Sequence, residues 1–156
     1  MRDFTHETLP GRVVFGAGRR RDLSNELKLL ESQRVVFISG SRNDPLVEDL
    51  RAELDIPSEK ILGVRPHVPE ADVAQAADVA GEFDADTVVS IGGGSATGLA
   101  KMVALNRDVT VVAIPTTYAG SEMTPIWGTT VDGEKQTGSS LRVLPAVVIY
   151  DPELTV

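Results

Sequence analysis

The stretch TVVSIGGGSATGLAKM, residues 87–102, passes from a β-branched apolar segment through three glycines into residues typical of a helix. Such a junction leaves the first backbone N–H groups of the helix unpaired, with the positive end of its dipole facing outward. Gly92, Gly93 and Gly94 have no Cβ to keep a phosphate away from the backbone, and Ser95 is placed to act as N-cap or phosphate donor. The turn therefore predicts an anion site. The alternative is a plain strand-to-helix turn in which the glycines serve only the tight geometry.

Apolar runs rich in valine and isoleucine alternate with helical patterns along the chain. The runs lie at 12–15, 34–39, 60–64, 87–92, 109–114 and 146–150. The helical patterns lie at about 20–31, 43–54, 70–82 and 95–106. Continuous apolar runs are typical of strands buried on both faces, and the alternation is typical of parallel sheets. The sequence thus predicts the α/β class: a Rossmann-like parallel sheet of about six strands flanked by helices.

One segment interrupts this alternation. In TTVDGEKQTG, residues 129–138, Asp132-Gly133 stands between two polar, threonine-containing arms. An Asp-Gly pair favours the tight turn of a β-hairpin. We therefore expect a small β-hairpin excursion from the sheet near residues 125–140.

Composition limits the classes of site and partner. The 156 residues include no cysteine, which excludes disulfides and thiolate metal sites, and the two histidines, His6 and His67, are too few for a histidine-rich metal site. No metal site is predicted within the chain. The formal net charge of −8 argues against a nucleic-acid partner. The basic run GRRR, residues 18–21, is expected to begin a solvated helix face, because Asp22 and Glu26 follow within helical reach.

The length suits one domain, residues 1–156, with a buried core. The first ten residues, MRDFTHETLP, contain no apolar targeting segment, and no apolar run approaches the roughly 18 residues needed to span a bilayer. We expect a soluble cytoplasmic protein without a membrane partner. The last residues, IYDPELTV, read as a strand followed by a proline break, which is typical of a domain boundary.

A second loop rich in hydroxyl groups follows another strand. In AIPTTYAGSEMTP, residues 113–125, the candidates are Thr116, Thr117, Tyr118 and Ser121. The carboxyl ends of parallel strands meet at one sheet edge, so we expect this loop to form one wall of a pocket beside Ser95. The alternative is a turn whose hydroxyl groups bond to their own backbone.

Two neighbouring features have simpler interpretations. FGAGRRR carries Gly16 and Gly18 after a strand, but Arg21 stands where a dinucleotide fingerprint needs its third glycine, so we interpret it as a strand-ending turn. Within the second loop, Tyr118 is expected to pack with one satisfied hydroxyl, and Glu122 to bond backbone donors. Lys101 is expected to point away from the phosphate turn.

Four segments together carry a resemblance. PGRVVFGAG, SIGGGSATGLAK, IPTTYAGSE and LPAVVIYDPELT resemble the N-terminal half of maleylacetate reductases within the iron-containing alcohol dehydrogenase superfamily. The resemblance implies that Gly92, Gly93, Gly94 and Ser95 hold the pyrophosphate of NAD(P), with Thr116, Thr117 and Ser121 on the nicotinamide side. It also suggests that His67, in VRPHVPE, approaches the ribose, although a loop histidine is often only solvated.

The resemblance also bears on coenzyme choice. In VVFISGSRND, Gly40 stands where members selective for NAD tend to carry aspartate, and Arg42 follows two residues later. Because an acidic residue at this place repels a 2′-phosphate, we expect both NADH and NADPH to be accepted. Ser39, Ser41 and Arg42 are the candidate 2′-phosphate contacts, unless Arg42 is a solvated loop residue.

Gly98 distinguishes between branches of the superfamily, because many metal-dependent members have aspartate there. It favours the maleylacetate reductase branch, in which NAD(P)H reduces maleylacetate to 3-oxoadipate during the degradation of aromatic compounds. By the resemblance, we expect the C-terminal helical domain of the family to be absent from this chain. By the resemblance, that domain would contact the small dicarboxylate substrate and hold any divalent metal, Fe or Zn, and the whole enzyme would be a homodimer.

No catalytic residue is assigned within the chain, and we expect the chain alone to be inactive. Two other functions remain open. One is a domain of a metal-dependent alcohol or glycerol-type dehydrogenase, and the other is a stand-alone nucleotide-binding module without catalysis.

Overall fold

Six strands form one parallel sheet in the order β1-β8-β5-β4-β2-β3, which confirms the predicted α/β fold. The computed structural model describes residue 5 and residues 7–155. The strands of the sheet are β1 (Arg12–Phe15), β2 (Val35–Ser39), β3 (Ser58–Leu62), β4 (Thr87–Gly92), β5 (Thr110–Pro115) and β8 (Val147–Tyr150). Each contains most of one apolar run recognised in the sequence.

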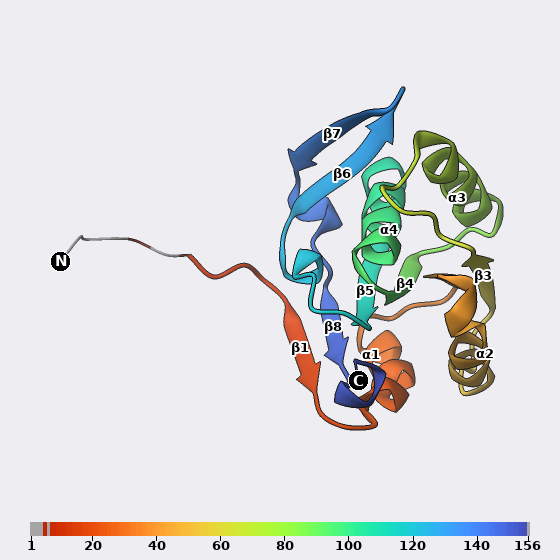
Figure 1. The fold of residues 1–156 in the computed structure, drawn as a ribbon. Helices are drawn as coiled ribbons and strands as arrows, with labels where there is room; N and C mark the ends of the chain where they lie inside the picture. Colours follow the sequence, from red (N-terminus) through yellow and green to blue (C-terminus); the bar gives the residue numbers. More distant parts are fainter. Residues whose placement is uncertain (1–4, 6, 156) are drawn as a thin grey trace.

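The four α-helices cover the two faces of the sheet in pairs (Figure 1). They are α1 (Leu23–Leu29), α2 (Asp44–Ala52), α3 (Glu70–Glu82) and α4 (Gly94–Asn106). The connections through α1 and α2 advance across the sheet in one direction, and those through α3 and α4 return in the other. Because crossovers between parallel strands are right-handed, the change of direction places the two pairs on opposite faces.

Two hydrophobic cores follow from the alternation of side chains along each strand. On β2, Val35 and Phe37 join the core beneath α1 and α2, whereas Val36 and Ile38 join the core beneath α3 and α4. All four are fully buried. A strand buried on both faces needs an apolar residue at every position, which explains the continuous runs in the sequence.

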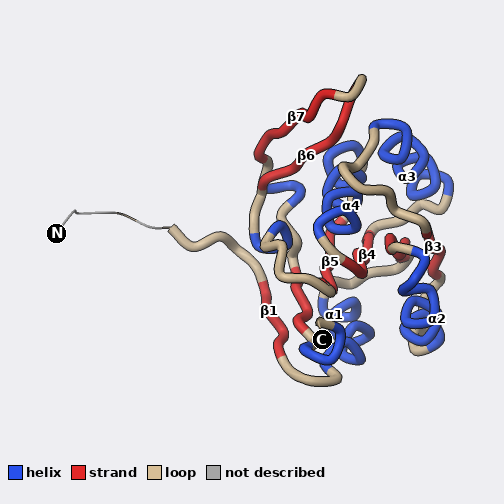
Figure 2. Tube along the Cα trace, in the orientation of Figure 1, coloured by secondary structure: helices blue, strands red, loops and turns tan. Residues whose placement is uncertain are grey.

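The predicted hairpin is present as a separate pair of antiparallel strands, β6 (Ile126–Val131) and β7 (Glu134–Ser139) (Figure 2). Its turn residues Asp132 and Gly133 both have positive φ, 50° and 79°, as a tight hairpin turn requires. Trp127 of β6 packs against the core beneath α3 and α4. The hairpin is therefore attached to the domain on the side of α4.

Five short 3-10 helices complete the structure: η1 (Arg19–Asp22), η2 (Ser41–Asn43), η3 (Ser121–Met123), η4 (Leu141–Val143) and η5 (Pro152–Leu154). The helical pattern expected at 20–31 is consequently divided between η1 and α1, and the one expected at 43–54 begins with η2.

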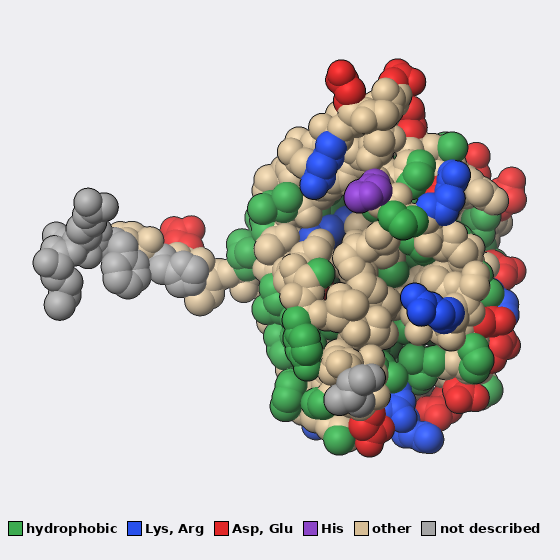
Figure 3. Space-filling view, in the orientation of Figure 1, with side chains coloured by type: hydrophobic (Ala, Val, Ile, Leu, Met, Phe, Trp, Pro, Cys, Tyr) green, Lys and Arg blue, Asp and Glu red, His purple; other side chains and the backbone are tan. Residues whose placement is uncertain are grey.

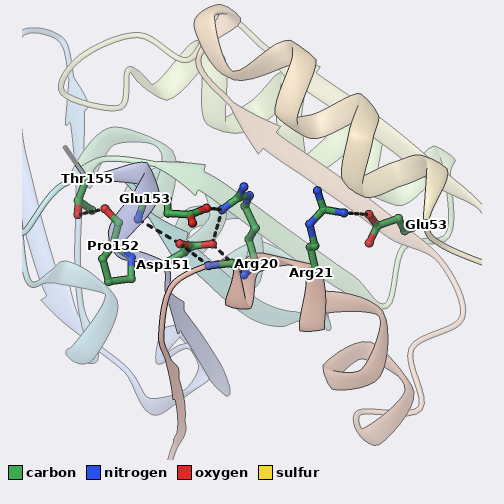
Figure 4. A network of polar contacts seen from close by, with 8 residues as sticks. Arg20, Arg21, Glu53, Asp151, Pro152, Glu153 and Thr155 are labelled. Carbon is green, nitrogen blue, oxygen red and sulfur yellow. Dashed lines mark hydrogen bonds and ion pairs between the residues drawn. The ribbon is translucent and has the colours of Figure 1, made fainter.

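The basic run at residues 18–21 is a structural junction and not simply a solvated helix face, as Figure 4 shows. The Arg20 guanidinium donates to Asp151 and Glu153, at 2.6 Å each, and the fully buried Asp151 carboxylate also accepts from the backbone N–H of Gly18. Burial alone would raise the pKa of Asp151, but these donors hold it below its usual value. The network joins the segment after β8 to the turn after β1.

Part of the N-terminal stretch considered above lies outside the described residues, namely residues 1–4 and His6. Within the part of the chain that the structure describes, no helix is both long and apolar enough to cross a membrane.

Lys101 is a charged residue in the middle of α4, and it is fully buried. Its Nζ donates to the carbonyl oxygens of Ser121, Thr124 and Ile126, at 2.8 Å for the last two. Two carbonyl groups before β6 and one at its first residue thus share one ammonium group, as expected for a residue directed away from the phosphate turn. Burial lowers the pKa of Lys101 to about 8, although the nearby Glu122 carboxylate raises it.

This buried ammonium predicts an unusual pH dependence of stability. In the unfolded chain Lys101 titrates near its ordinary pKa of 10.5, above the folded value of about 8. Between these pH values the unfolded state binds more protons, so the free energy of unfolding rises with pH. In urea titrations, the advantage of wild type over Lys101→Met should therefore grow from pH 8 to pH 10.

Lys60→Met is the matched control, because hydrogen bonds from Lys60 to Asp44 and Glu48 raise the pKa of that lysine. Lys60 contributes to the free energy of unfolding below its unfolded pKa, and this contribution is lost only as pH rises through the raised folded pKa. The difference in stability between wild type and Lys60→Met should therefore stay constant from pH 8 to pH 10. A constant or falling difference for Lys101→Met would mean that the carbonyl bonds outweigh the cost of burial.

Candidate functional site

The glycine turn brings the end of β4 and the start of α4 to the carboxyl edge of the sheet. Gly92 ends β4 with φ of +148°, and Gly93 is the N-cap of α4. Ser95 is the second residue of the helix, so its expected role as N-cap is wrong. No side chain caps the helix, and the N–H groups of its first turn are left to another partner.

A cavity of about 730 Å³ lies beside this turn, between the carboxyl ends of β2 and β4. The chain leaves β2 towards α2 on one face and leaves β4 towards α4 on the other, so no connection covers the gap between these two strands. The cavity brings together nine of the predicted residues: Gly40, Ser41, Arg42, Gly92, Gly93, Gly94, Ser95, Thr116 and Thr117. The remaining lining residues are Asn43, Gly63, Val64, Ala96 and Leu154.

Close neighbours leave little room for a side chain at two of the three glycines of the turn. A Cβ at Gly92 would lie 3.0 Å from the Cβ of Ala96, in a backbone conformation that side chains rarely adopt. At Gly93 it would lie 3.2 Å from the side chain of Thr117. Backbone N–H groups are thereby exposed to the cavity with no side chain in front of them, which suits a phosphate.

A second cavity, of about 390 Å³, meets the first at Gly94 and Ser95. Two more predicted residues, His67 and Ser121, line this smaller cavity. Ser39 lines neither cavity, so its predicted contact with a 2′-phosphate is wrong: it is fully buried, and its hydroxyl donates to the carbonyl oxygen of Ile91 at 2.7 Å. Its other lining residues come mainly from the hairpin and the turn before α3: Val68, Gly98, Ile126, Trp127, Gly128, Thr129, Thr130, Lys135 and Thr137.

Tyr118 lines neither cavity and is 78% exposed, so the expectation of a packed tyrosine is wrong. Its hydroxyl does have one partner, Oγ1 of Thr155, at 2.9 Å. Glu122 is buried and structural, but its bond runs to a side chain and not to backbone donors. The Tyr150 hydroxyl donates to Glu122 Oε1 at 2.6 Å, and burial together with this bond raises the pKa of Tyr150.

Among the residues that the structure describes, no acidic side chain lines either cavity, although the chain carries a formal charge of −8. Arg42 stands in the larger cavity, and His67 and Lys135 stand in the smaller one. Figure 3 shows a face whose middle consists mostly of uncharged polar side chains and backbone, with acidic side chains along its upper, right and lower edges. The local charge therefore favours an anion despite the net charge of the chain.

Sequence reasoning missed several lining residues. Asn43 and Leu154 lie in segments that the sequence analysis did consider, but neither residue was assigned a role, and the amide of Asn43 donates to the carbonyl oxygen of Ile91 at 3.4 Å. Lys135 was considered only as part of a hairpin arm. Its position in the smaller cavity depends on how the hairpin packs on α4, for which the local sequence contains no signal.

Among the described residues, no group of three or more histidine, aspartate or glutamate side chains is arranged to hold a metal ion. The two cavities instead present glycine backbone, hydroxyl groups and three basic side chains, Arg42, His67 and Lys135.

Comparison with known proteins gives consistent matches. The chain is 50% identical to a maleylacetate reductase of Pseudomonas sp. and 46% identical to maleylacetate reductase 2 of Cupriavidus pinatubonensis, over 98% and 97% of its length. The crystal structure of maleylacetate reductase from Agrobacterium tumefaciens superposes with a TM-score of 0.94, at 40% identity over 99% of this chain and 45% of that one. The chain spans 44% and 43% of the two curated relatives.

The profile of the iron-containing alcohol dehydrogenase family matches residues 10–152, which include every strand of the sheet, the glycine turn and the hairpin. The chain belongs to the iron-containing alcohol dehydrogenase family.

Proposed function

We propose that this chain is the coenzyme-binding domain of an NAD(P)H-dependent oxidoreductase. The observation that carries the proposal is the pair of cavities that meet at Gly94 and Ser95, at the uncapped start of α4. A dinucleotide has two nucleoside halves joined by a pyrophosphate. The junction suits the pyrophosphate, because unpaired N–H groups and the helix dipole both favour negative charge.

The two halves of the coenzyme then take the two cavities. The larger one has apolar walls at Val64 and Leu154 that suit an adenine base, with Gly40–Arg42 positioned for the adjacent ribose. The nicotinamide half takes the smaller cavity, beside His67 and Ser121. Thr117, whose side chain approaches Gly93, borders the pyrophosphate together with Thr116.

The substrate we propose is maleylacetate, reduced to 3-oxoadipate, as the names of the relatives suggest. Gly98 supports this branch. A Cβ there would lie 2.9 Å from Cγ2 of Val68, so the aspartate that metal-dependent members carry has no room. NAD(P)H supplies the hydride. Groups that bind a dicarboxylate, a divalent metal if one takes part, and the partner of a homodimer are proposed to involve residues beyond those described.

The substrate proposal is tested with the full-length protein that contains this chain. NADH and NADPH should be oxidised rapidly in the presence of maleylacetate. Reduction of NAD⁺ or NADP⁺ by glycerol or butanol should be at least about 100-fold slower in kcat/KM. We expect this because a site that binds two carboxylates has charged groups that stay unpaired when a small alcohol binds instead. Comparable activity with a small alcohol would favour the alcohol dehydrogenase alternative. Coenzyme binding without turnover of any of these substrates would favour the stand-alone binding module.

Binding at the glycine turn is tested with Gly93→Val. The branched side chain would collide with Thr117 or occupy the place of the phosphate, so NADH affinity should fall by about 100-fold or more, as expected when about 3 kcal/mol of anion binding is lost. Calorimetric titration measures the affinity, and circular dichroism checks the fold. Gly11→Val is the control, because Gly11 lies before β1, where a Cβ meets only Pro145 O at 3.8 Å. Unchanged affinity in folded Gly93→Val would show that the pyrophosphate binds elsewhere.

Coenzyme choice is tested at Gly40, where φ is −72° and no atom lies within 4 Å of an added Cβ. Gly40→Asp should therefore fold normally and weaken NADPH binding by about 1–3 kcal/mol through repulsion of the 2′-phosphate, while NADH binding is spared. Gly40→Asn adds a side chain of the same shape without the charge, so the ratio of NADPH affinity to NADH affinity should stay near that of wild type. If wild type strongly prefers NADH to NADPH, or if Gly40→Asp leaves the ratio of the two affinities unchanged, another residue determines which coenzyme is bound.

A further inference from the structure

The turn before α3 contains two consecutive residues in a conformation that they rarely adopt. His67 and Val68 have φ of 65° and 48°. Left-handed backbone is uncommon outside glycine, and for a β-branched residue such as valine it is an outlier. Strained residues of this kind persist only where the surrounding structure holds them, and they cluster at ligand sites.

The hairpin holds this turn through three hydrogen bonds. The Thr129 hydroxyl and the Thr130 backbone N–H donate to the carbonyl oxygen of Val68, at 2.8 and 3.1 Å. The Thr130 hydroxyl donates to the carbonyl oxygen of His67 at 2.8 Å. Both carbonyl groups of the strained pair are therefore bonded to adjacent residues of β6, more than 60 positions away in sequence.

The opposite side of the turn is pressed against α4. Val68 is only 6% exposed, and its Cγ2 stands so close to Gly98 that any side chain there would collide. The turn is thus fixed between β6 and the first turns of α4. In that position His67 lines the smaller cavity together with Ser95 and Gly94.

We propose that Thr129 and Thr130 are positioning residues, which hold the His67–Val68 turn so that the His67 imidazole contacts the nicotinamide half of the bound coenzyme. The inference rests on the proposed coenzyme site. The β6–β7 hairpin, which lies outside the main sheet, then completes that site without itself needing to contact the reacting atoms.

The central experiment is a double-mutant cycle read out by NADH fluorescence titration. Thr129→Val/Thr130→Val removes both hydroxyl donors and keeps the side-chain shape. It should weaken NADH binding about tenfold, as expected from two hydrogen bonds of ordinary strength. In a His67→Ala background the same pair should change affinity less than about twofold, because the positioned group is already gone. Thr130→Ser restores one hydroxyl and should recover part of the loss relative to Thr130→Val.

Thr110→Val, at the amino end of β5, is the matched control and should bind NADH as wild type does. Equal weakening in both backgrounds would show that the threonines act on the cavity as a whole and not through His67. No weakening in either background would show that packing of Val68 alone holds the turn. Either result overturns the inference.

A second readout needs no coenzyme. In NMR spectra of the ligand-free protein, the His67 imidazole signal, assigned by its loss in His67→Ala, should move towards the value of a free histidine in Thr129→Val/Thr130→Val. An unchanged signal would contradict the inference. If wild type binds neither NADH nor NADPH, the proposed function is wrong, and this signal alone decides whether the threonines position His67.

Discussion

The handedness of strand connections is the constraint on which the candidate site depends. Right-handed crossovers place α2 on one face of the sheet and α4 on the other. The chain therefore leaves the ends of the neighbouring strands β2 and β4 towards opposite faces. No loop then covers the carboxyl ends of these two strands. The larger cavity is the result, and the uncapped start of α4 is directed into it because α4 begins at the end of β4. Local glycine chemistry refines this site, but the topology creates the space.

Helix α4 links the two ends of the site. Its first turn borders both cavities, while Lys101 further along binds three carbonyl groups of the segment that leads into the hairpin. All three carbonyl groups accept a hydrogen bond from this one ammonium group, and that of Ser121 also accepts from the Thr124 backbone N–H and hydroxyl. Buried polar groups joined in this way specify one arrangement of a loop, because any other arrangement leaves a desolvated acceptor unpaired. The hairpin thereby has a defined place against α4.

Features set by near neighbours in the sequence were predicted well. Helix α3 has the predicted bounds of residues 70–82, and the Asp132–Gly133 turn occurs where the dipeptide indicates it. Features set by distant neighbours were not. Arg20 pairs with Asp151, 131 residues away, and no local pattern distinguishes that pairing from a solvated helix face. Likewise, His67 and Ser121 line a different cavity from Thr116 because of where the hairpin packs. The sequence carries no signal for that packing, so one pocket was predicted where the structure has two.

The separation of charge described above has a kinetic consequence. At long range an anionic coenzyme meets the field of a chain with a formal charge of −8, whereas at contact it meets cavities without acidic side chains. Dissolved salt screens interactions beyond roughly 10 Å at 0.1 M much more than it screens short contacts within a cavity. Association should therefore quicken as ionic strength rises from low values, which reverses the behaviour of proteins that steer anions with a positive surface. The rim of the site then limits the rate of encounter, while the interior determines how long the coenzyme stays.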